Sequence, residues 1–290
     1  MKKYILFFFL LASAWADPKI KVVATFSILS DLVRQVGGDR VEVASLVGED
    51  QDPHMYEPKP SDIKKITDAD LVFINGLGFE GWLKRLIESS DYKGELIVVS
   101  DAVHPRLVFE GTLIRDPHAW HSIPNAKIYV TNILEALKKL DPASQDYYEK
   151  RARTYLSSLT KLDQSIREEI DQIPPQRRKI ITAHDAFGYF GNTYGVEFLA
   201  PKGISTETEA KVQNVVDLIK KIRKYKIKTV FIENIADPKL LKQIAQEGGA
   251  TLGGTLYSDA LSSKDGPAPT YLEMMRYNVD LLLSSMQQYP

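Results

Sequence analysis

The sequence has 290 residues, of which 44% are hydrophobic and 26% are charged, a composition typical of globular proteins rather than of disordered, fibrous or multi-span membrane chains. The 37 lysines and arginines nearly balance the 38 acidic residues, and the formal charge of -1 provides no broad basic surface for nucleic acid. The absence of cysteine excludes thiol nucleophiles, disulfides, iron–sulfur clusters and cysteine-ligated zinc. Any metal site must therefore use histidine, aspartate and glutamate.

The first residues have the pattern of a signal peptide. Lys2 and Lys3 precede an apolar run at 4–11, and small residues at 14 and 16 fit an A-x-A cleavage site. The run is far shorter than the roughly 20 residues that span a bilayer. We expect a signal peptide at residues 1–16, cleaved near Ala16, and export to the periplasm. Because no cysteine follows the run, we expect no lipid anchor on the mature chain.

The part of the chain that follows alternates short β-type runs with helix-type runs. In the first half, strands are predicted at 20–26, 41–47, 71–75 and 95–99, and helices at 27–36, 59–69 and 79–89. The second half repeats this order, with strands at 179–183, 196–199, 229–233 and 250–256, and helices at 187–194, 211–225 and 239–246. The Val-Glu-Val start at 41–43 recurs as Val-Glu-Phe at 196–198, which suggests an internal duplication. This alternation predicts an α/β fold of two similar lobes, each a parallel-rich sheet flanked by helices.

A single long helix is predicted between the lobes. Asp141 is a good N-cap with Pro142 at the next position, and two prolines at 174–175 end the segment. Apolar residues recur every three or four positions and form one helical face, about 48 Å long: Tyr148, Ala152, Tyr155, Leu159, Leu162, Ile166, Ile170 and Ile173. The alternatives are a packed spine along both lobes, which we favour, and a coiled-coil arm. The predicted division is signal peptide 1–16, N-terminal lobe 17–140, linker helix 141–174 and C-terminal lobe 175–290.

Four polar residues follow predicted strands, at the carboxyl ends where open α/β sheets bind ligands. His54 lies in the Asp-Pro-His-Met-Tyr-Glu-Pro loop at 52–58, and His118 lies in Asp-Pro-His-Ala-Trp at 116–120. In the second half, His184 follows the first strand and Asp259 follows the last one. If the lobes face each other, all four residues converge on the cleft between them.

Three imidazoles and one carboxylate form a closed four-ligand set that suits Zn2+ and has enough oxygen character for Mn2+. Neutral imidazole is the binding form, so binding should weaken as the pH falls toward about 6.5. Three nearby acids, Asp52, Asp116 and Asp185, could accept the second imidazole proton of the ligands. The alternative is that these aspartates serve only as turn or N-cap residues.

Other polar residues near these motifs are weaker candidates. His121 lies three residues after His118, and a His-x-x-His pair could bind metal, but helical ligand pairs favour a spacing of four. His104 is expected on the surface. Glu57, Glu207 and Glu209 are possible supporting or alternative oxygen ligands, with a solvated loop acid the favoured interpretation for Glu209. Trp120 is expected to pack, and its position close to His118 would make it a fluorescence reporter.

At these motifs the sequence resembles the cluster A-I family of metal receptors, the zinc and manganese solute-binding proteins of bacterial ABC transporters. The similarity covers essentially the whole mature chain. Beyond the two Asp-Pro-His motifs it includes Thr-Ala-His-Asp-Ala-Phe-Gly-Tyr-Phe at 182–190, Gly-Ile-Ser-Thr-Glu-Thr-Glu-Ala at 203–210 and Leu-Tyr-Ser-Asp-Ala-Leu-Ser at 256–262.

The resemblance implies that one Zn2+ or Mn2+ is bound by His54, His118, His184 and Asp259, between lobes joined by one rigid helix. It also implies a receptor that delivers the ion to a membrane permease. We expect this protein to be a monomer. Two departures from the family's sequence pattern bear on which metal is preferred. Residues 105–115 lack the histidine-rich loop of many zinc receptors in the family, whereas His184 replaces the glutamate that manganese-preferring members often carry.

Two other functions are alternatives to metal-ion capture. An exported zinc metallohydrolase would need an open coordination position for water, which Asp259 closes in this ligand set. The sequence also contains no H-E-x-x-H motif, no G-x-S-x-G motif and no phosphate-binding glycine loop. A surface adhesin-type relative is the other alternative, and no residue pattern supports it. We therefore expect a binding protein without enzymatic activity.

Overall fold

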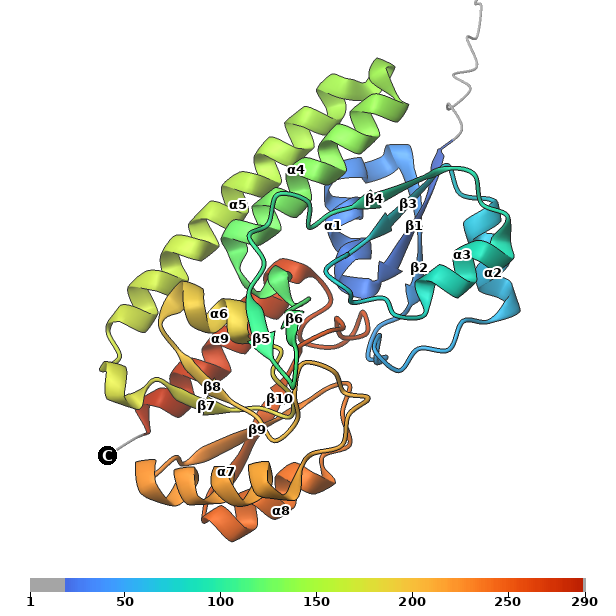
Figure 1. Cartoon of the computed structure of the whole chain (residues 1–290). Coiled ribbons are helices and arrows are strands. Elements are labelled where there is room, and N and C mark those ends of the chain that lie inside the picture. Colours follow the sequence, from blue (N-terminus) through green and yellow to red (C-terminus); the bar gives the residue numbers. More distant parts are fainter. Residues whose placement is uncertain (1–18, 289–290) are drawn as a thin grey trace, which may run out of the picture.

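The computed structural model describes residues 19–288, and the predicted signal peptide lies outside the described residues. Two four-stranded parallel sheets dominate the fold (Figure 1). The first sheet contains β1 (Ile20–Phe26), β2 (Val41–Val47), β3 (Leu71–Ile74) and β4 (Glu95–Val98) in the order β2-β1-β3-β4. The second contains β7 (Lys179–Ile181), β8 (Glu197–Leu199), β9 (Thr229–Glu233) and β10 (Thr251–Leu256) in the order β8-β7-β9-β10. Counted within each half, both sheets have the same strand order, which confirms the predicted pair of similar α/β lobes.

Helices cover the two faces of the first sheet, and the strand sequences reflect this. The central strand β1 buries Val22, Val23 and Ala24 in succession, without the alternation of a sheet that has one wet face. Helix α1 (Ser27–Gly37) lies on one side of the sheet, and α2 (Pro60–Thr67) and α3 (Leu83–Ser90) lie on the other (Figure 1).

The second sheet is covered in the same way. Helices α7 (Val212–Tyr225) and α8 (Lys239–Gly248) pack together on one side of it. Helix α6 (Gly188–Tyr194) and the C-terminal α9 (Tyr271–Gln287) lie on the other side (Figure 1). The sequence patterns did not predict α9. It packs against β7 and β10 and returns the chain to the long helix α5 (Gln145–Asp171).

Helix α5 is a packed spine and not a free coiled-coil arm. All of its predicted apolar positions are buried except Leu162, which is half-buried. It contacts α1 of the first lobe and α6 and α9 of the second. The α-helix is shorter than the predicted 141–174 because Pro142–Ser144 and Pro175–Arg177 form separate 3-10 turns at its two ends. Ser144, rather than Asp141, occupies its N-cap position.

A hairpin and a helix lie in the part of the chain between β4 and α5. A small antiparallel hairpin, β5 (Leu107–Phe109) and β6 (Leu113–Arg115), lies between the two sheets (Figure 1). Helix α4 (Ile123–Leu140) follows it and runs alongside α5. Among residues 19–288, no helix is both long and apolar enough to span a bilayer. The exact domain boundaries proposed from the sequence stay a prediction.

Candidate metal centre

The four residues that the sequence places beyond strand ends meet between the two sheets. His54 lies in the β2–α2 loop, and His118 follows β6 directly before a 3-10 turn. His184 lies between β7 and α6, and Asp259 lies between β10 and α9. All four side chains are buried, and each has one potential ligand atom within 4.8 Å of those of the other three. The carboxyl ends of the strands in the two lobes therefore face each other across one site.

Asp259 is the centre of this cluster. Its Oδ2 atom lies 3.2 Å from His184 Nε2 and 3.3 Å from His54 Nε2. Its Oδ1 atom lies 3.6 Å from His118 Nε2. Burial alone would raise the pKa of Asp259, but the adjacent His184 and His118 hold that pKa well below its usual range. The carboxylate is therefore ionised, which is the form that binds a cation.

Several buried atoms of the cluster have no hydrogen-bond partner. His184 Nε2 and both carboxylate oxygens of Asp259 are in this state. Their short separations lack hydrogen-bond geometry, although buried polar groups in folded proteins are nearly always satisfied. Nitrogen and oxygen lone pairs directed at a common point are the donor set of a divalent transition metal. The residues present therefore fit a bound metal ion.

His184 is held by a buried carboxylate on the neighbouring strand β9. Its Nδ1 atom donates to Glu233 Oε2 at 2.6 Å. Glu233 Oε1 accepts from the backbone N–H groups of Ala183 and His184, and Oε2 also accepts from the Ser258 hydroxyl. With the proton on Nδ1, Nε2 keeps its lone pair for a metal. Burial alone would lower the pKa of His184, but Glu233 and Asp259 raise it well above the ordinary value.

His118 is oriented in the same way by Asp116, two residues before it. Its Nδ1 atom lies 2.8 Å from Asp116 Oδ1, which also accepts from the His118 backbone N–H at 3.0 Å. The other carboxylate oxygen of Asp116 pairs with Arg106 Nη1 at 2.7 Å. Asn75 positions the same segment, because its side-chain amide donates to the Pro117 carbonyl at 2.9 Å.

His54 differs from the other two histidines because its backbone, rather than its ring, is held by a carboxylate. The His54 N–H donates to Asp52 Oδ1 at 2.9 Å, and the other oxygen of Asp52 accepts from the Thr206 hydroxyl of the second lobe. Trp82 Nε1 donates to the carbonyl of Pro53, which fixes the loop further. The ring packs edge-on against Phe79 with the ring centroids 4.9 Å apart.

Of the three aspartates considered as acceptors of the second imidazole proton, the structure confirms Asp116 alone. Asp52 binds the backbone of His54, and Asp185 pairs with Arg106 at 3.5 Å instead of with His184. Glu233, which no sequence motif singled out, takes the place assigned to Asp185. Its signal was its position as the last residue of a predicted strand, because that placement brings its side chain to the same sheet edge as His184.

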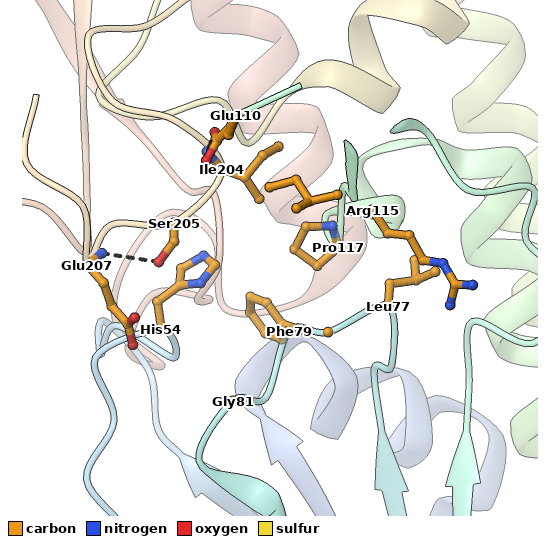
Figure 2. A pocket seen from close by; sticks show the side chains of 12 residues that line it. His54, Leu77, Phe79, Gly81, Glu110, Arg115, Pro117, Ile204, Ser205 and Glu207 are labelled. Atoms are coloured by element: carbon orange, nitrogen blue, oxygen red, sulfur yellow. Dashed lines mark hydrogen bonds between the residues drawn. The ribbon is translucent and has the colours of Figure 1, made fainter. Parts of the chain in front are cut away.

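A cavity of about 500 Å³ leads from the surface to His54 (Figure 2). One side is formed by the first lobe, including Leu77, Phe79 and Pro117, and the other by Ile204, Ser205 and Glu207 of the second. The cavity gives an ion a path to the ligand cluster. Glu207 is exposed at this opening and lies outside the cluster that contains the four candidate ligands.

The remaining candidates from the sequence are not members of the ligand cluster. Glu57 and Glu209 are exposed, as is His104, which agrees with its expected surface position. Trp120 is fully buried, with its ring centroid 5.3 Å from that of His118. His121 is fully buried and packs on Phe187, and both of its ring nitrogens lack a hydrogen-bond partner. Burial lowers the pKa of His121 to about 3.

Two similar α/β lobes that enclose a site at their facing strand ends, with a long helix along both, define a two-lobed solute-binding protein. The family described as "Zinc-uptake complex component A periplasmic" matches residues 22–285, and the chain belongs to this family. The match confirms the resemblance seen in the sequence motifs.

Similar proteins share both the sequence and the fold. The manganese ABC transporter substrate-binding lipoprotein PsaA of Streptococcus anginosus is 32% identical over 95% of this chain and 92% of its own length. The metal ABC transporter substrate-binding lipoprotein FimA of Streptococcus parasanguinis is 33% identical over 96% and 92%. The periplasmic zinc-binding protein TroA of Treponema pallidum superimposes with a TM-score of 0.88 at 29% identity, covering 93% of this chain and 99% of that one. A manganese-bound periplasmic metal-binding protein of Candidatus Liberibacter asiaticus superimposes with a TM-score of 0.84 at 32% identity, covering 93% and 100%.

Proposed function

We propose that this protein is the solute-binding component of a divalent-metal ABC uptake transporter, which captures an ion and delivers it to a membrane permease. The observation that carries the proposal is the buried cluster of His54, His118, His184 and Asp259, whose potential ligand atoms lie within 4.8 Å of one another, with those of His184 and Asp259 lacking a hydrogen-bond partner. Each lobe supplies two of these residues. Binding an ion therefore ties the lobes together, and release separates them.

We propose Zn2+ or Mn2+ as the transported ion, bound at one site by those four residues. Three imidazoles favour Zn2+ over Mn2+ in the Irving–Williams order, while the carboxylate of Asp259 adds an oxygen ligand that Mn2+ accepts. The names of the similar proteins include both metals. Four protein ligands leave no coordination position open for a reactive water, so the site suits capture of an ion rather than metal-assisted hydrolysis.

The location and partners belong to the same proposal. We propose that the protein is exported to the periplasm, acts as a monomer without nucleic acid, and has the domain division predicted from the sequence. The streptococcal relatives are named lipoproteins, whereas this sequence contains no cysteine, and we propose that it functions without a lipid anchor. Fractionation of cells tests the proposed location. The protein should be recovered in the periplasmic fraction, and recovery with membranes after a salt wash would contradict the proposal.

Thermal unfolding of the metal-stripped mature chain, titrated separately with Zn2+ and Mn2+ at neutral pH, tests the function. A ligand that binds only the folded state stabilises it by about 2.7 kcal/mol at a hundredfold excess over its dissociation constant. We expect a saturable rise in Tm with Zn2+ and, if the receptor serves both metals, with Mn2+. His118→Ala should abolish most of the shift, whereas the exposed His104→Ala should leave it unchanged. A full shift in the His118 variant would show that the ligand assignment is wrong.

A further inference from the structure

Arg106 links the two lobes beside the metal site. It precedes β5 of the hairpin, and its side chain is only 24% exposed. Its Nη1 atom pairs with Asp116 Oδ2 at 2.7 Å, and its Nη2 atom lies 3.5 Å from Asp185 Oδ2. Asp116 orients His118, and Asp185 directly follows His184. One guanidinium therefore bridges carboxylates that belong to ligand-bearing segments on opposite sides of the cleft.

The backbone around Arg106 strengthens the same connection. The Arg106 N–H donates to the Tyr189 hydroxyl of α6 at 2.8 Å. That hydroxyl in turn donates to the Asp116 carbonyl at 3.1 Å. Tyr189 belongs to the second lobe, whereas Arg106 and Asp116 come from the chain that precedes α4. Side-chain and main-chain bonds thus cross the cleft at the same place.

The second lobe is shaped to receive the guanidinium. Gly188 begins α6, and a Cβ atom at this position would collide with the guanidinium of Arg106. The guanidinium is the far end of a flexible side chain, so a methyl group here would displace Arg106 without disturbing the backbone. Gly188 is helical and not in the left-handed region, so alanine should otherwise favour the folded state by restricting the unfolded chain.

The charges explain what the bridge does. Asp116 is fully buried, and Asp185 is partly buried on the facing lobe. Without the guanidinium, closure of the lobes would bring these two carboxylates together with no cation between them, and like charges in a partly dry site oppose closure. With Arg106 in place, each carboxylate meets a positive charge as the lobes approach.

We propose that Arg106 is a positioning residue that latches the lobes over the bound ion and thereby sets the rate at which the ion leaves. The inference rests on the proposed metal-binding function. Loss of a partly buried charge pair acts mainly on dissociation rates. Arg106→Gln should therefore release the ion about tenfold faster, while the rate of binding changes little.

Stopped-flow release of Zn2+ from the full mature chain into an excess of a chelating dye measures this rate directly. Arg106→Lys should fall between wild type and Arg106→Gln, because an ammonium keeps the charge but lacks the fork that reaches two carboxylates. Gly188→Ala should also speed release, although the smaller conformational freedom of the unfolded alanine chain favours the folded metal-free protein. A variant that only loosened the fold could not produce this combination.

Asp185→Asn distinguishes two roles of Arg106: a latch between the two lobes, and an effect confined to Asp116 and His118 in the first lobe. In the Arg106→Gln background it removes the carboxylate that Asp116 would face, so the double variant should release Zn2+ more slowly than Arg106→Gln alone. If Arg106 acted only by orienting Asp116 and His118, Asp185→Asn would change the rate in neither background, and that result would overturn the latch.

Arg276→Gln is the matched control. It breaks an ion pair with Glu169 between α9 and α5 at a similar side-chain exposure of 30%, away from the metal site, and should leave the release rate unchanged. If wild type holds Zn2+ but Arg106→Gln and Gly188→Ala release it at the wild-type rate, the latch is wrong and the proposed function stands. If wild type holds no Zn2+ or Mn2+, both proposals fail.

Discussion

His118 and His184 receive the same support from opposite lobes, yet the supporting carboxylates face different neighbours. Each histidine donates its Nδ1 proton to a buried acid, Asp116 in one case and Glu233 in the other. Asp116 shares its charge with Arg106. Within residues 19–288, Glu233 accepts from His184 and otherwise from neutral groups, namely two backbone N–H groups and a serine hydroxyl.

This difference makes the two imidazoles unequal ligands. A carboxylate that no cation neutralises places its full charge behind the imidazole and makes the far nitrogen a stronger donor to a metal. Burial would lower the pKa of His184, but Glu233 together with Asp259 raises it well above its ordinary value. Two lobes with one strand order thus supply histidines of the same geometry but different donor strength.

Glu233→Gln should give the largest effect. Glu233 uses both oxygens as acceptors, one for the Ala183 and His184 N–H groups and one for His184 Nδ1, whereas glutamine has a single acceptor oxygen. Its amide nitrogen must therefore face donors at one of the two places. Where it faces Nδ1, the ring of His184 would adopt the other tautomer or turn away, and its lone pair at Nε2 would be lost. Changes to such supporting groups typically cost 10- to 100-fold in metal affinity. We expect a loss of about 100-fold, measured by competition with a chelator of known affinity.

Ser258→Ala is the control for this substitution. It removes a different donor to the same oxygen of Glu233 while leaving the acceptor of the imidazole proton in place. Its affinity should stay within a few-fold of wild type. Equal losses in the two variants would mean that Glu233 matters for packing rather than for the tautomer of His184.

Asp116→Asn sharpens the comparison, because it makes the same chemical change in the other lobe. The asparagine oxygen can still accept from His118, and the charge that is removed was already shared with Arg106. We expect a loss of about tenfold, smaller than that of Glu233→Gln. The chelator competition ranks the two directly, and a larger loss for Asp116→Asn would reverse the proposed order of donor strength.

Much of this architecture follows from local sequence patterns. Strand runs, helical periodicity and the placement of His54, His118, His184 and Asp259 beyond strand ends predicted two lobes and a shared site. These features are determined by residues close together in the chain. The strand order within each sheet then brings the four side chains to one edge.

The supporting groups were harder to predict because they depend on contacts between distant segments. Asp116 was found since it lies two residues from His118, whereas Glu233 lies 49 residues from His184. Arg106 was missed for the same reason, since its bond to Asp185 spans 79 residues. The hairpin and α4 also went unpredicted, and the short strands β5 and β6 have largely exposed apolar residues that give no core periodicity.

His121 is the histidine that breaks the pattern. The sequence allowed it to pair with His118, but Ala119–His121 forms a 3-10 turn and the ring packs on Phe187 instead. Neither ring nitrogen has a partner, and no carboxylate orients it as Asp116 and Glu233 orient the other two. Leaving buried polar groups unsatisfied costs about 1–3 kcal/mol, so this imidazole should destabilise the fold.

His121→Leu should therefore stabilise the metal-free protein by about 1 kcal/mol at pH 7 and leave metal affinity unchanged.

Burial lowers the pKa of His121 to about 3, against 6.5 in the unfolded chain. Between these values the unfolded state binds a proton that the folded state does not, so the wild-type residue costs more stability as the pH falls. At pH 5.5 the advantage of the leucine variant should be larger by about 1 kcal/mol. Urea unfolding of both proteins at the two pH values measures the difference, in which the effects of the other titrating groups cancel. If the stability advantage of the leucine variant did not grow on acidification, burial would not lower the pKa of His121 as expected. The imidazole would then have a hydrogen-bond acceptor in the folded protein in solution.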